Sequence, residues 1–167
     1  MLNNPLTHQA KSRPLTLGER QMARRVFGAA LVLDDIRLKT AWWVLKGYAV
    51  APDGNIYFHP SDWCDDFCQK NLAHRAWLIH ELTHVWQRQQ GICVFWRALF
   101  NRRYRYRLKA DKSFWRYGVE QQACMVEDFY IRCERGEDCT AWRQCIPFLA
   151  DLSNLSNTTN YDNDTKT

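Results

Sequence analysis

The segment His80-Glu81-Leu82-Thr83-His84 places two histidines and a glutamate in the pattern H-E-x-x-H. Histidines four residues apart lie on one face of a helix, about one turn apart, where both imidazoles can bind the same ion. Glu81 lies beside them and can act as a general base toward water. The segment therefore predicts a metal site built on a helix.

The residues around this segment predict that helix. An apolar stripe from Leu72 to Trp86 recurs at helical spacing, and we expect residues 65–90 to be helical in one or two pieces. Gly91 follows as a stop signal. Both histidines therefore fall well inside the predicted helix.

A hydrolytic zinc site usually has three protein ligands and one open position. We prefer Glu120 as the third ligand because it opens a second predicted helix, residues 119–135, and because the small Ala123 lets that helix approach closely. The other candidates are Glu127, Asp128, Asp111, His59 and His74. We expect His74 to be a surface histidine, because it falls on roughly the opposite helix face from His80.

Elsewhere the sequence predicts a further helix and a small β-structure. Thr16 and Glu19 form a capping box at the start of a helix over residues 17–30. The remaining predicted elements are a strand over residues 36–39, a hairpin of residues 48–51 and 55–58 around Pro52-Asp53-Gly54, and helices over residues 94–99 and 140–152. An extended peptide is expected to pair with the exposed edge of strand 55–58.

Length and composition predict one packed domain. The chain has 167 residues, 46% of them apolar, and a net charge of +5, so disorder of the whole chain is excluded. We expect a flexible N-terminal arm over residues 1–14, the domain over 15–153 and a disordered polar tail over 154–167. No ordinary signal peptide and no membrane-spanning run are visible in the sequence.

The seven cysteines do not have the spacing of a zinc knuckle. Cys93 and Cys124 are interpreted as small buried apolar residues. Cys133, Cys139 and Cys145 are candidates for disulfide pairing if the protein works in an oxidising compartment.

Basic and aromatic residues alternate over residues 101–118. Such interleaving fits a groove for single-stranded nucleic acid. It also fits a half-buried segment with Tyr104, Tyr106 and Leu108 inward and the basic side chains in solvent, and this is the interpretation we favour. An acidic substrate or partner is the next alternative, and nucleic acid is the least favoured.

Several motifs occur in a fixed order along residues 15–132. They are Leu15-Thr16-x-Gly18-Glu19 with Val26-Phe27-Gly28, Gly54-Asn55-Ile56-Tyr57-Phe58, His80-Glu81-Leu82-Thr83-His84-Val85-Trp86-Gln87, Tyr104-x-Tyr106, and Tyr117-Gly118-Val119-Glu120-Gln121-Gln122-Ala123. In this order they resemble the small zincin metallopeptidase-like domains associated with Vgr and Rhs elements of bacteria. The resemblance implies an α+β fold, a compact helical zincin-like domain with a small antiparallel β-sheet or hairpin next to the HExxH helix.

The resemblance also implies a gluzincin-type site. In it His80, His84 and Glu120 bind Zn²⁺ and Glu81 is the general base. Many gluzincins carry Asp or Asn four residues after the glutamate ligand to orient the first histidine, but this chain has Cys124 there. Glu127, Asp128 or a backbone carbonyl would then have to orient His80, or the metal is held less rigidly.

The activity that the resemblance implies is zinc-dependent hydrolysis of peptide bonds in a protein or peptide substrate. Tyr117 is the candidate donor to the developing oxyanion, and Tyr57, Tyr104 and Tyr106 are candidate substrate-binding residues. A metal-stabilised adaptor module of a secretion apparatus, catalytically weak or inactive, is the alternative. A nucleic-acid-associated metalloprotease is the second alternative.

The same resemblance implies a toxin or effector of a type VI-like secretion system. Its expected partners are a Vgr-type spike carrier and an immunity protein. The chain would be made in the bacterial cytoplasm without a signal peptide and carried into the periplasm of a target cell. An oxidising periplasm would also account for the many cysteines.

Overall fold

The structure, a computed structural model, describes residues 10–92 and 105–149. The predicted helix over residues 94–99, the tail over 154–167, Cys93 and Tyr104 lie outside the described residues. The described elements are β1 (Ser12–Pro14), α1 (Leu17–Phe27), β2 (Arg37–Thr40), β3 (Ala49–Val50), β4 (Ile56–Phe58), η1 (Pro60–Asp62), η2 (Phe67–Gln69), α2 (Leu72–Gln89), η3 (Phe114–Arg116), α4 (Val119–Glu134) and α5 (Thr140–Cys145).

The start of α1 is the predicted capping box. The Thr16 hydroxyl accepts from the Glu19 backbone N–H at 3.1 Å, and the Glu19 carboxylate accepts from the Thr16 N–H at 2.8 Å. The helix ends at Phe27, three residues before the predicted end. Gly28 follows with φ of 53°, a conformation that favours glycine, and its N–H closes the last turn on the Arg24 carbonyl.

Glu19 also connects α1 to two distant segments. Its buried carboxylate accepts both Arg13 Nη atoms, at 2.7 and 2.8 Å, and the backbone N–H of Phe67 at 2.8 Å. With the hydrogen bond from the Thr16 N–H, the Glu19 carboxylate accepts four hydrogen bonds, which compensate for the burial of its charge. These hydrogen bonds fix Arg13 of β1. Ser12–Pro14 were predicted to belong to a flexible N-terminal arm, but they form a strand.

The sheet is mixed, with strand order β1-β2-β4-β3. β1 pairs with β2 and β3 pairs with β4 in antiparallel fashion, but β2 and β4 are parallel, so the prediction of a purely antiparallel sheet is wrong. The predicted hairpin is confirmed as β3 and β4. Ile56 and Phe58 are buried on one face, and Tyr57 is half-buried on the other, as the alternation predicts.

The inner position of β4 also corrects the prediction of its exposed edge. Both of its sides are occupied, because Leu38–Thr40 pair with it on one side and Ala49–Val50 on the other. The edge that remains on this side of the sheet belongs to β3.

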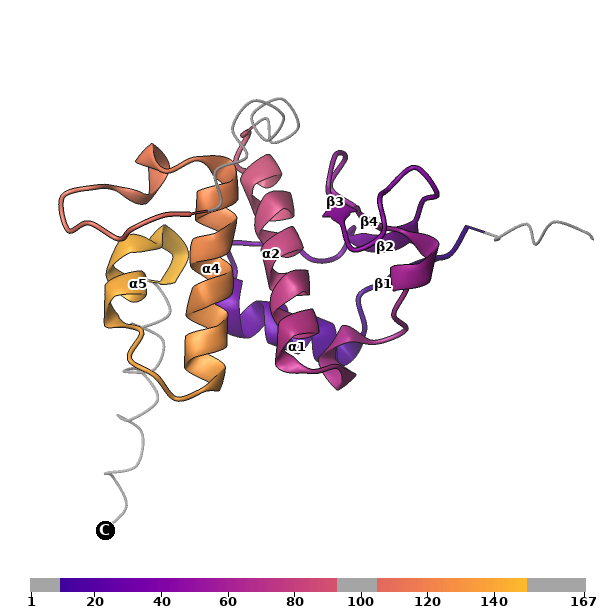
Figure 1. Cartoon of the computed structure of the whole chain (residues 1–167), viewed down its shortest axis with the longest axis horizontal. Helices are drawn as coiled ribbons and strands as arrows, with labels where there is room; N and C mark the ends of the chain where they lie inside the picture. The colour runs from indigo at the N-terminus through magenta and orange to yellow at the C-terminus, as the bar shows by residue number, and fades with distance from the viewer. Residues whose placement is uncertain (1–9, 93–104, 150–167) are drawn as a thin grey trace, which may run out of the picture.

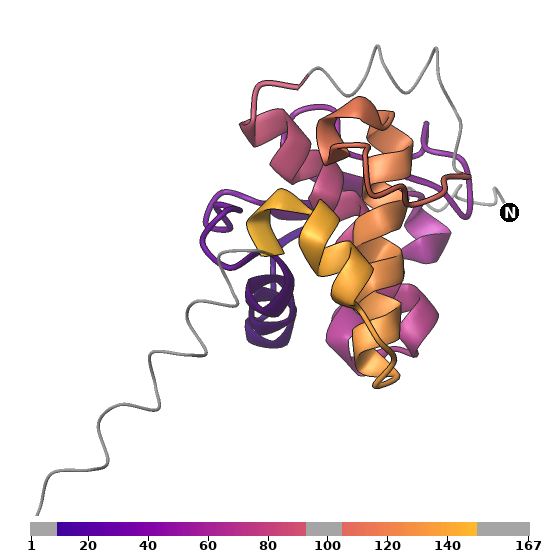
Figure 2. The same cartoon turned by 90° about the vertical axis from the view of Figure 1, so that its left-hand side faces the viewer.

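The helices and the sheet form successive layers. α2 lies between the sheet and α4, with α1 crossing at the lower end of both helices (Figure 1). α5 packs on α4, which the side view also shows (Figure 2). No described helix is long and apolar enough to cross a membrane.

An aromatic cluster fixes α2 against the sheet. The Phe58 ring of β4 lies 5.1 Å from the rings of Phe67 and Trp77, measured between centroids. Asn71 caps α2 by accepting from the His74 N–H, and η2 precedes it, so the predicted helix over residues 65–90 is present in two pieces. This packing aims the H-E-x-x-H face of α2 away from the sheet and toward α4, the helix that α2 contacts most extensively.

Candidate metal centre

Three of the predicted ligands come together between α2 and α4. The Nε2 atoms of His80 and His84 lie 3.5 and 3.4 Å from the same carboxylate oxygen of Glu120, Oε2. One ligand atom of each residue falls within 4.8 Å of the other two. Two imidazoles and a carboxylate that converge in this way form a donor set suited to a divalent cation such as Zn²⁺.

The start of α4 positions Glu120. The side-chain oxygen of Gln121 accepts from the Gly118 N–H at 3.1 Å and stabilises the first turn. Ala123, one turn further along, is fully buried. Because its side chain is a single methyl group, it permits the close approach of the two helices that the sequence predicts.

Glu81 is buried beside these ligands, and its Oε2 atom has no hydrogen-bond partner among the described residues. Burial raises the pKa of the carboxyl above its ordinary value, while the nearby His80 and His84 act in the opposite direction. A buried polar atom without a partner is costly, and a ligand that completes its hydrogen bonding removes that cost. Glu81 therefore fits a site in which a metal ion and a water molecule complete the hydrogen bonding.

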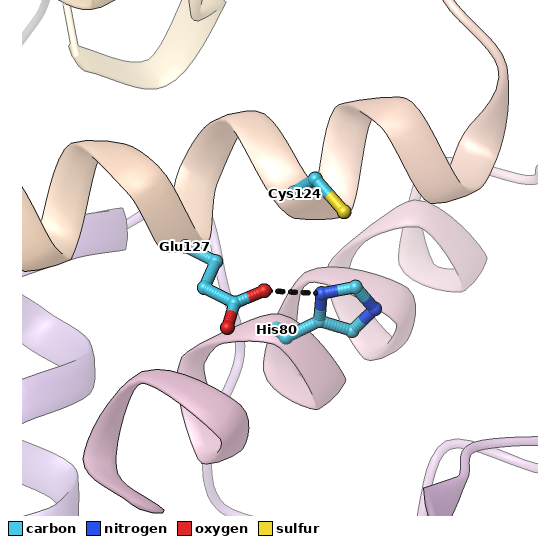
Figure 3. A group of neighbouring side chains, drawn as sticks. All are labelled: His80, Cys124 and Glu127. Atoms are coloured by element: carbon cyan, nitrogen blue, oxygen red, sulfur yellow. Dashed lines mark hydrogen bonds and ion pairs between the residues drawn. The ribbon is translucent and has the colours of Figure 1, made fainter. Parts of the chain in front are cut away.

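The other nitrogen of His80 faces a second group of side chains. His80 Nδ1 lies 2.9 Å from Glu127 Oε2, and Cys124 projects from α4 beside the same ring (Figure 3). His80, Cys124 and Glu127 also have donor atoms within 4.8 Å of one another. The two groups share one imidazole, whose Nε2 belongs to the first and whose Nδ1 belongs to the second.

Glu127 is thus placed to orient His80, one of the roles that the sequence analysis left open for it. A carboxylate on the second ring nitrogen holds the ring orientation and favours the tautomer that leaves Nε2 free for a metal. Cys124, expected to be a buried apolar residue, is only half-buried.

His84 is oriented by residues for which the sequence analysis proposed no role. Gln87 Oε1 lies 2.8 Å from His84 Nδ1, and Gln87 Nε2 donates to the Val119 carbonyl and to Gln122 Oε1, both at 2.9 Å. Gln122 donates in turn to the carbonyls of Phe114 and Tyr117. The spacing of three between His84 and Gln87 on one helix face is the sequence signal that points to this role.

The ligands also change one another's protonation. Burial disfavours the charged form of His80, but hydrogen bonds with Cys124, Glu120 and Glu127 outweigh it and raise its pKa well above the ordinary value. Burial likewise disfavours ionised Glu120, yet the hydrogen bonds from His80 and His84 outweigh it and lower the pKa of Glu120 strongly. Without a metal ion, a protonated imidazole therefore supplies the positive charge that faces the Glu120 carboxylate.

The predicted tyrosines lie in other places. The Tyr117 hydroxyl donates to the Arg107 carbonyl at 2.8 Å and accepts from the Lys109 N–H at 3.2 Å, so it is engaged with the backbone and not with the ligands. The Tyr106 hydroxyl forms a short hydrogen bond with Asp128 and accepts from Trp142 Nε1 at 3.0 Å. Burial and the Asp128 carboxylate raise the pKa of Tyr106.

Tyr57 lies on the sheet, where it donates to Asp53 at 2.7 Å and packs against the Trp43 ring. The histidines considered as alternative ligands contact residues near them in the sequence. His59 caps η1, and His74 lies 2.9 Å from Asn71, the residue that caps α2. Neither they nor the exposed Asp111 belong to a group of ligand atoms among the described residues.

The described cysteines are all free. Disulfide pairing of Cys133, Cys139 and Cys145 in an oxidising compartment stays a prediction. Cys133 and Cys139 lie close together, with their Sγ atoms 3.1 Å apart. Burial and the adjacent Cys139 thiol raise the pKa of Cys133.

Fold and site together define an α+β domain whose two central helices carry a His-His-Glu group and a buried glutamate. The chain is 34% identical over 131 residues to the type VI secretion system spike protein VgrG2b of Pseudomonas aeruginosa. This similarity covers 71% of the chain but 13% of the much longer spike protein. No protein-family model matches the chain.

The solved effector domain of Pseudomonas aeruginosa VgrG2b has a similar fold. Its TM-score with this chain is 0.70 at 29% sequence identity, and the match covers 86% of each chain. Together the two similarities support a Vgr-associated effector domain of type VI secretion.

Proposed function

We propose that this chain is a zinc-dependent metallopeptidase that acts as an effector of a type VI-like secretion system. The observation that carries the proposal is the convergence of His80, His84 and Glu120 beside the buried, partnerless oxygen of Glu81. Two imidazoles, one carboxylate and an adjacent general base are the residue types that zinc peptidases use.

The three proposed ligands bind the metal, and Glu81 transfers the proton. His80, His84 and Glu120 would hold Zn²⁺, whose chemistry when bound is Lewis-acid polarisation of the scissile carbonyl. Burial raises the pKa of Glu81 above its ordinary value, which makes the carboxylate a stronger base. Glu81 takes a proton from the attacking water and delivers it to the leaving amine, and Glu127 and Gln87 hold the two imidazoles in place.

The proposed biological setting follows from the similarity to the VgrG2b effector domain. A spike protein of the Vgr type would carry the chain from the cytoplasm of the producing bacterium into the periplasm of a target cell. An immunity protein would protect the producer. The substrate would be a protein or a peptide.

The test separates metal binding from turnover. We expect wild-type protein to contain stoichiometric zinc, His80→Ala to contain none, and Glu81→Gln to keep the metal. Peptide-bond hydrolysis, measured as new amino termini in a bacterial protein extract, should fall about 10²- to 10⁴-fold in Glu81→Gln. Glu137→Gln, an exposed acidic residue after α4, is the matched control and should retain activity.

Growth of a host that exports the chain to its periplasm provides the second readout. Toxicity that disappears with Glu81→Gln supports the enzyme. Toxicity that persists in a zinc-loaded Glu81→Gln chain contradicts it and favours the adaptor.

A further inference from the structure

An open pocket of about 920 Å³ adjoins the metal centre. Gln121, Cys124, Glu127 and Asp128 of α4 line it together with residues 105–109, Lys112, Tyr117 and Trp142. Cys124 and Glu127 also face the His80 ring (Figure 3). The pocket and the candidate metal centre therefore share Cys124 and Glu127, so a group held in the pocket lies near His80.

Four cationic and two acidic side chains line the pocket. The cationic ones are Arg105, Arg107, Lys109 and Lys112, and none of the four forms an ion pair within residues 10–92 and 105–149. The two acidic lining residues already have partners, because Glu127 pairs with His80 and Asp128 with the Tyr106 hydroxyl. The charge that the pocket offers to a ligand is therefore positive.

The backbone that carries these cations is fixed. Gln121 Nε2 donates to the Arg105 carbonyl at 2.7 Å, and the Tyr117 hydroxyl bridges the Arg107 carbonyl and the Lys109 N–H. Lys112 lies over the Tyr117 ring, with its Nζ atom 3.8 Å from the ring centroid. Hydrogen bonds that fix the backbone lower the part of the entropy cost of binding that comes from ordering this segment.

We propose that this pocket binds the carboxylate of an acidic residue next to the scissile peptide bond. The inference rests on the proposed peptidase function and adds the substrate class, an acidic peptide. Arginine binds carboxylates in bidentate fashion, and lysine adds charge without a fixed geometry. Recognition of this kind selects by charge and weakens as salt is added.

The aromatic residues of this segment favour a peptide over a nucleic acid. Stacking of bases requires exposed rings between the cations. Here Phe114 and Tyr117 are buried, Tyr106 is half-buried with its hydroxyl engaged, and the exposed Trp115 is stacked on Trp86 with 5.6 Å between ring centroids. Trp142, the third ring in the lining, is half-buried and covered by the Arg132 guanidinium, which lies 4.4 Å from its ring centroid. The aromatic rings of the pocket are thus already packed or covered, which disfavours base stacking.

The first experiment measures binding in the full chain carrying Glu81→Gln and loaded with zinc. The probe is a fluorescent alanine hexapeptide with two central glutamates, and its twin carries two glutamines. We expect the acidic peptide to bind about tenfold more tightly at about 0.15 M salt. Arg107→Gln with Lys109→Gln should remove this difference, whereas the matched control Lys46→Gln with Lys70→Gln, two exposed lysines outside the pocket, should keep it.

Three results would overturn the proposal: equal binding of the two peptides, an equal loss of preference in the control, or tighter binding of a single-stranded oligonucleotide than of the acidic peptide. Circular dichroism and zinc content identify a variant that has failed to fold. In that case the single substitutions Arg107→Gln and Lys109→Gln take its place, each with an expected partial loss.

The second experiment separates this proposal from the peptidase itself. The active chain is incubated with a mixture of bacterial peptides, and the residues on either side of each cut are counted. Enrichment of Asp and Glu at one position supports the pocket. Cutting without that enrichment overturns it while the peptidase stands, and charge-selective binding without any cutting leaves the pocket and removes the peptidase.

Discussion

His80 has a different neighbour on each ring nitrogen, which makes it the residue on which the site depends most. Nε2 faces Glu120 and His84, and Nδ1 faces Glu127. The position that often supplies the orienting carboxylate in gluzincins is Cys124 in this chain. Glu127 is three residues further along α4, on the same face of that helix, and therefore reaches the same ring.

At the residue scale, we expect Glu127→Ala to weaken zinc binding about 10- to 100-fold, because His80 loses the partner that fixes its ring. Competition with a chelator of known affinity measures this change. Glu127→Gln keeps an acceptor for Nδ1 and should recover most of the affinity. Glu134→Ala, on the same helix but paired with Arg75, is the control, and an equal effect there would contradict the role of Glu127.

The convergence of His80, His84 and Glu120 could be predicted from the sequence, but the side chains that contact the outer atoms of these residues could be predicted only in part. His80 and His84 follow from a spacing of four on one helix, and Glu120 follows from its place at the start of a helix with a small residue behind it. The contact of Gln87 with Gln122 depends on how α2 and α4 cross and on side-chain rotamers. The spacing of residues along one helix determines neither the helix crossing nor the rotamers.

At the scale of elements, Asp66 joins the start of α1 to η2. Its Oδ1 accepts from the Thr16 hydroxyl and from the Cys68 N–H, both at 3.0 Å. Burial acts to raise the pKa of Asp66, but the hydrogen bonds from Cys68 and Thr16 outweigh it and leave the pKa below its ordinary value of 3.8. The folded state therefore favours the ionised carboxylate.

We expect Asp66→Ala to lower the free energy of unfolding by about 1 kcal/mol at pH 7, as the loss of a capping residue does. Because the folded-state pKa is depressed, this contribution is present above the unfolded pKa and is lost as the pH falls through the folded pKa. The difference from wild type should thus be constant down to about pH 5 and shrink in more acidic solution. Urea titrations across this range measure it.

The control for Asp66 is Asp35→Ala, because Asp35 is exposed and makes no hydrogen bond to a described side chain. It should change stability little at any pH. A difference for Asp66→Ala that grew on acidification would contradict the sign argued from its pKa.

Elements with strong local signals could be predicted, including the β3–β4 hairpin, but the pairing of strands that lie far apart in the sequence could not. The capping box at Thr16 and the turn at Pro52-Asp53-Gly54 are local, and both are present. The parallel pairing of β2 with β4 joins two very short strands, so a few buried side chains such as Leu38 and Ile56 determine it. Such tertiary contacts override local preference in short strands.

At the scale of the whole molecule, the candidate metal centre lies between the two halves of the fold. α2 packs on the sheet and α4 packs on α5, and ligands from both helices would hold one ion (Figure 1). A ligand that binds only the folded state stabilises it by mass action. At a zinc concentration about 1,000 times the Kd, the gain is about 4 kcal/mol.

We therefore expect a chelator to lower the Tm of the zinc-loaded protein by about 10 °C. Calorimetry with and without chelator measures the shift, and added zinc should reverse it. His80→Ala should melt at one temperature under both conditions. A chelator effect of equal size in that variant would show that the ion binds elsewhere.

The outer strands of the sheet affect whether the sheets of two copies of this chain can pair. These two strands, Ser12–Pro14 and Ala49–Val50, are very short, and the first contains a proline that has no N–H to donate. Short edges and edge prolines prevent sheets of neighbouring molecules from joining. The fold thereby limits aggregation through its sheet edges.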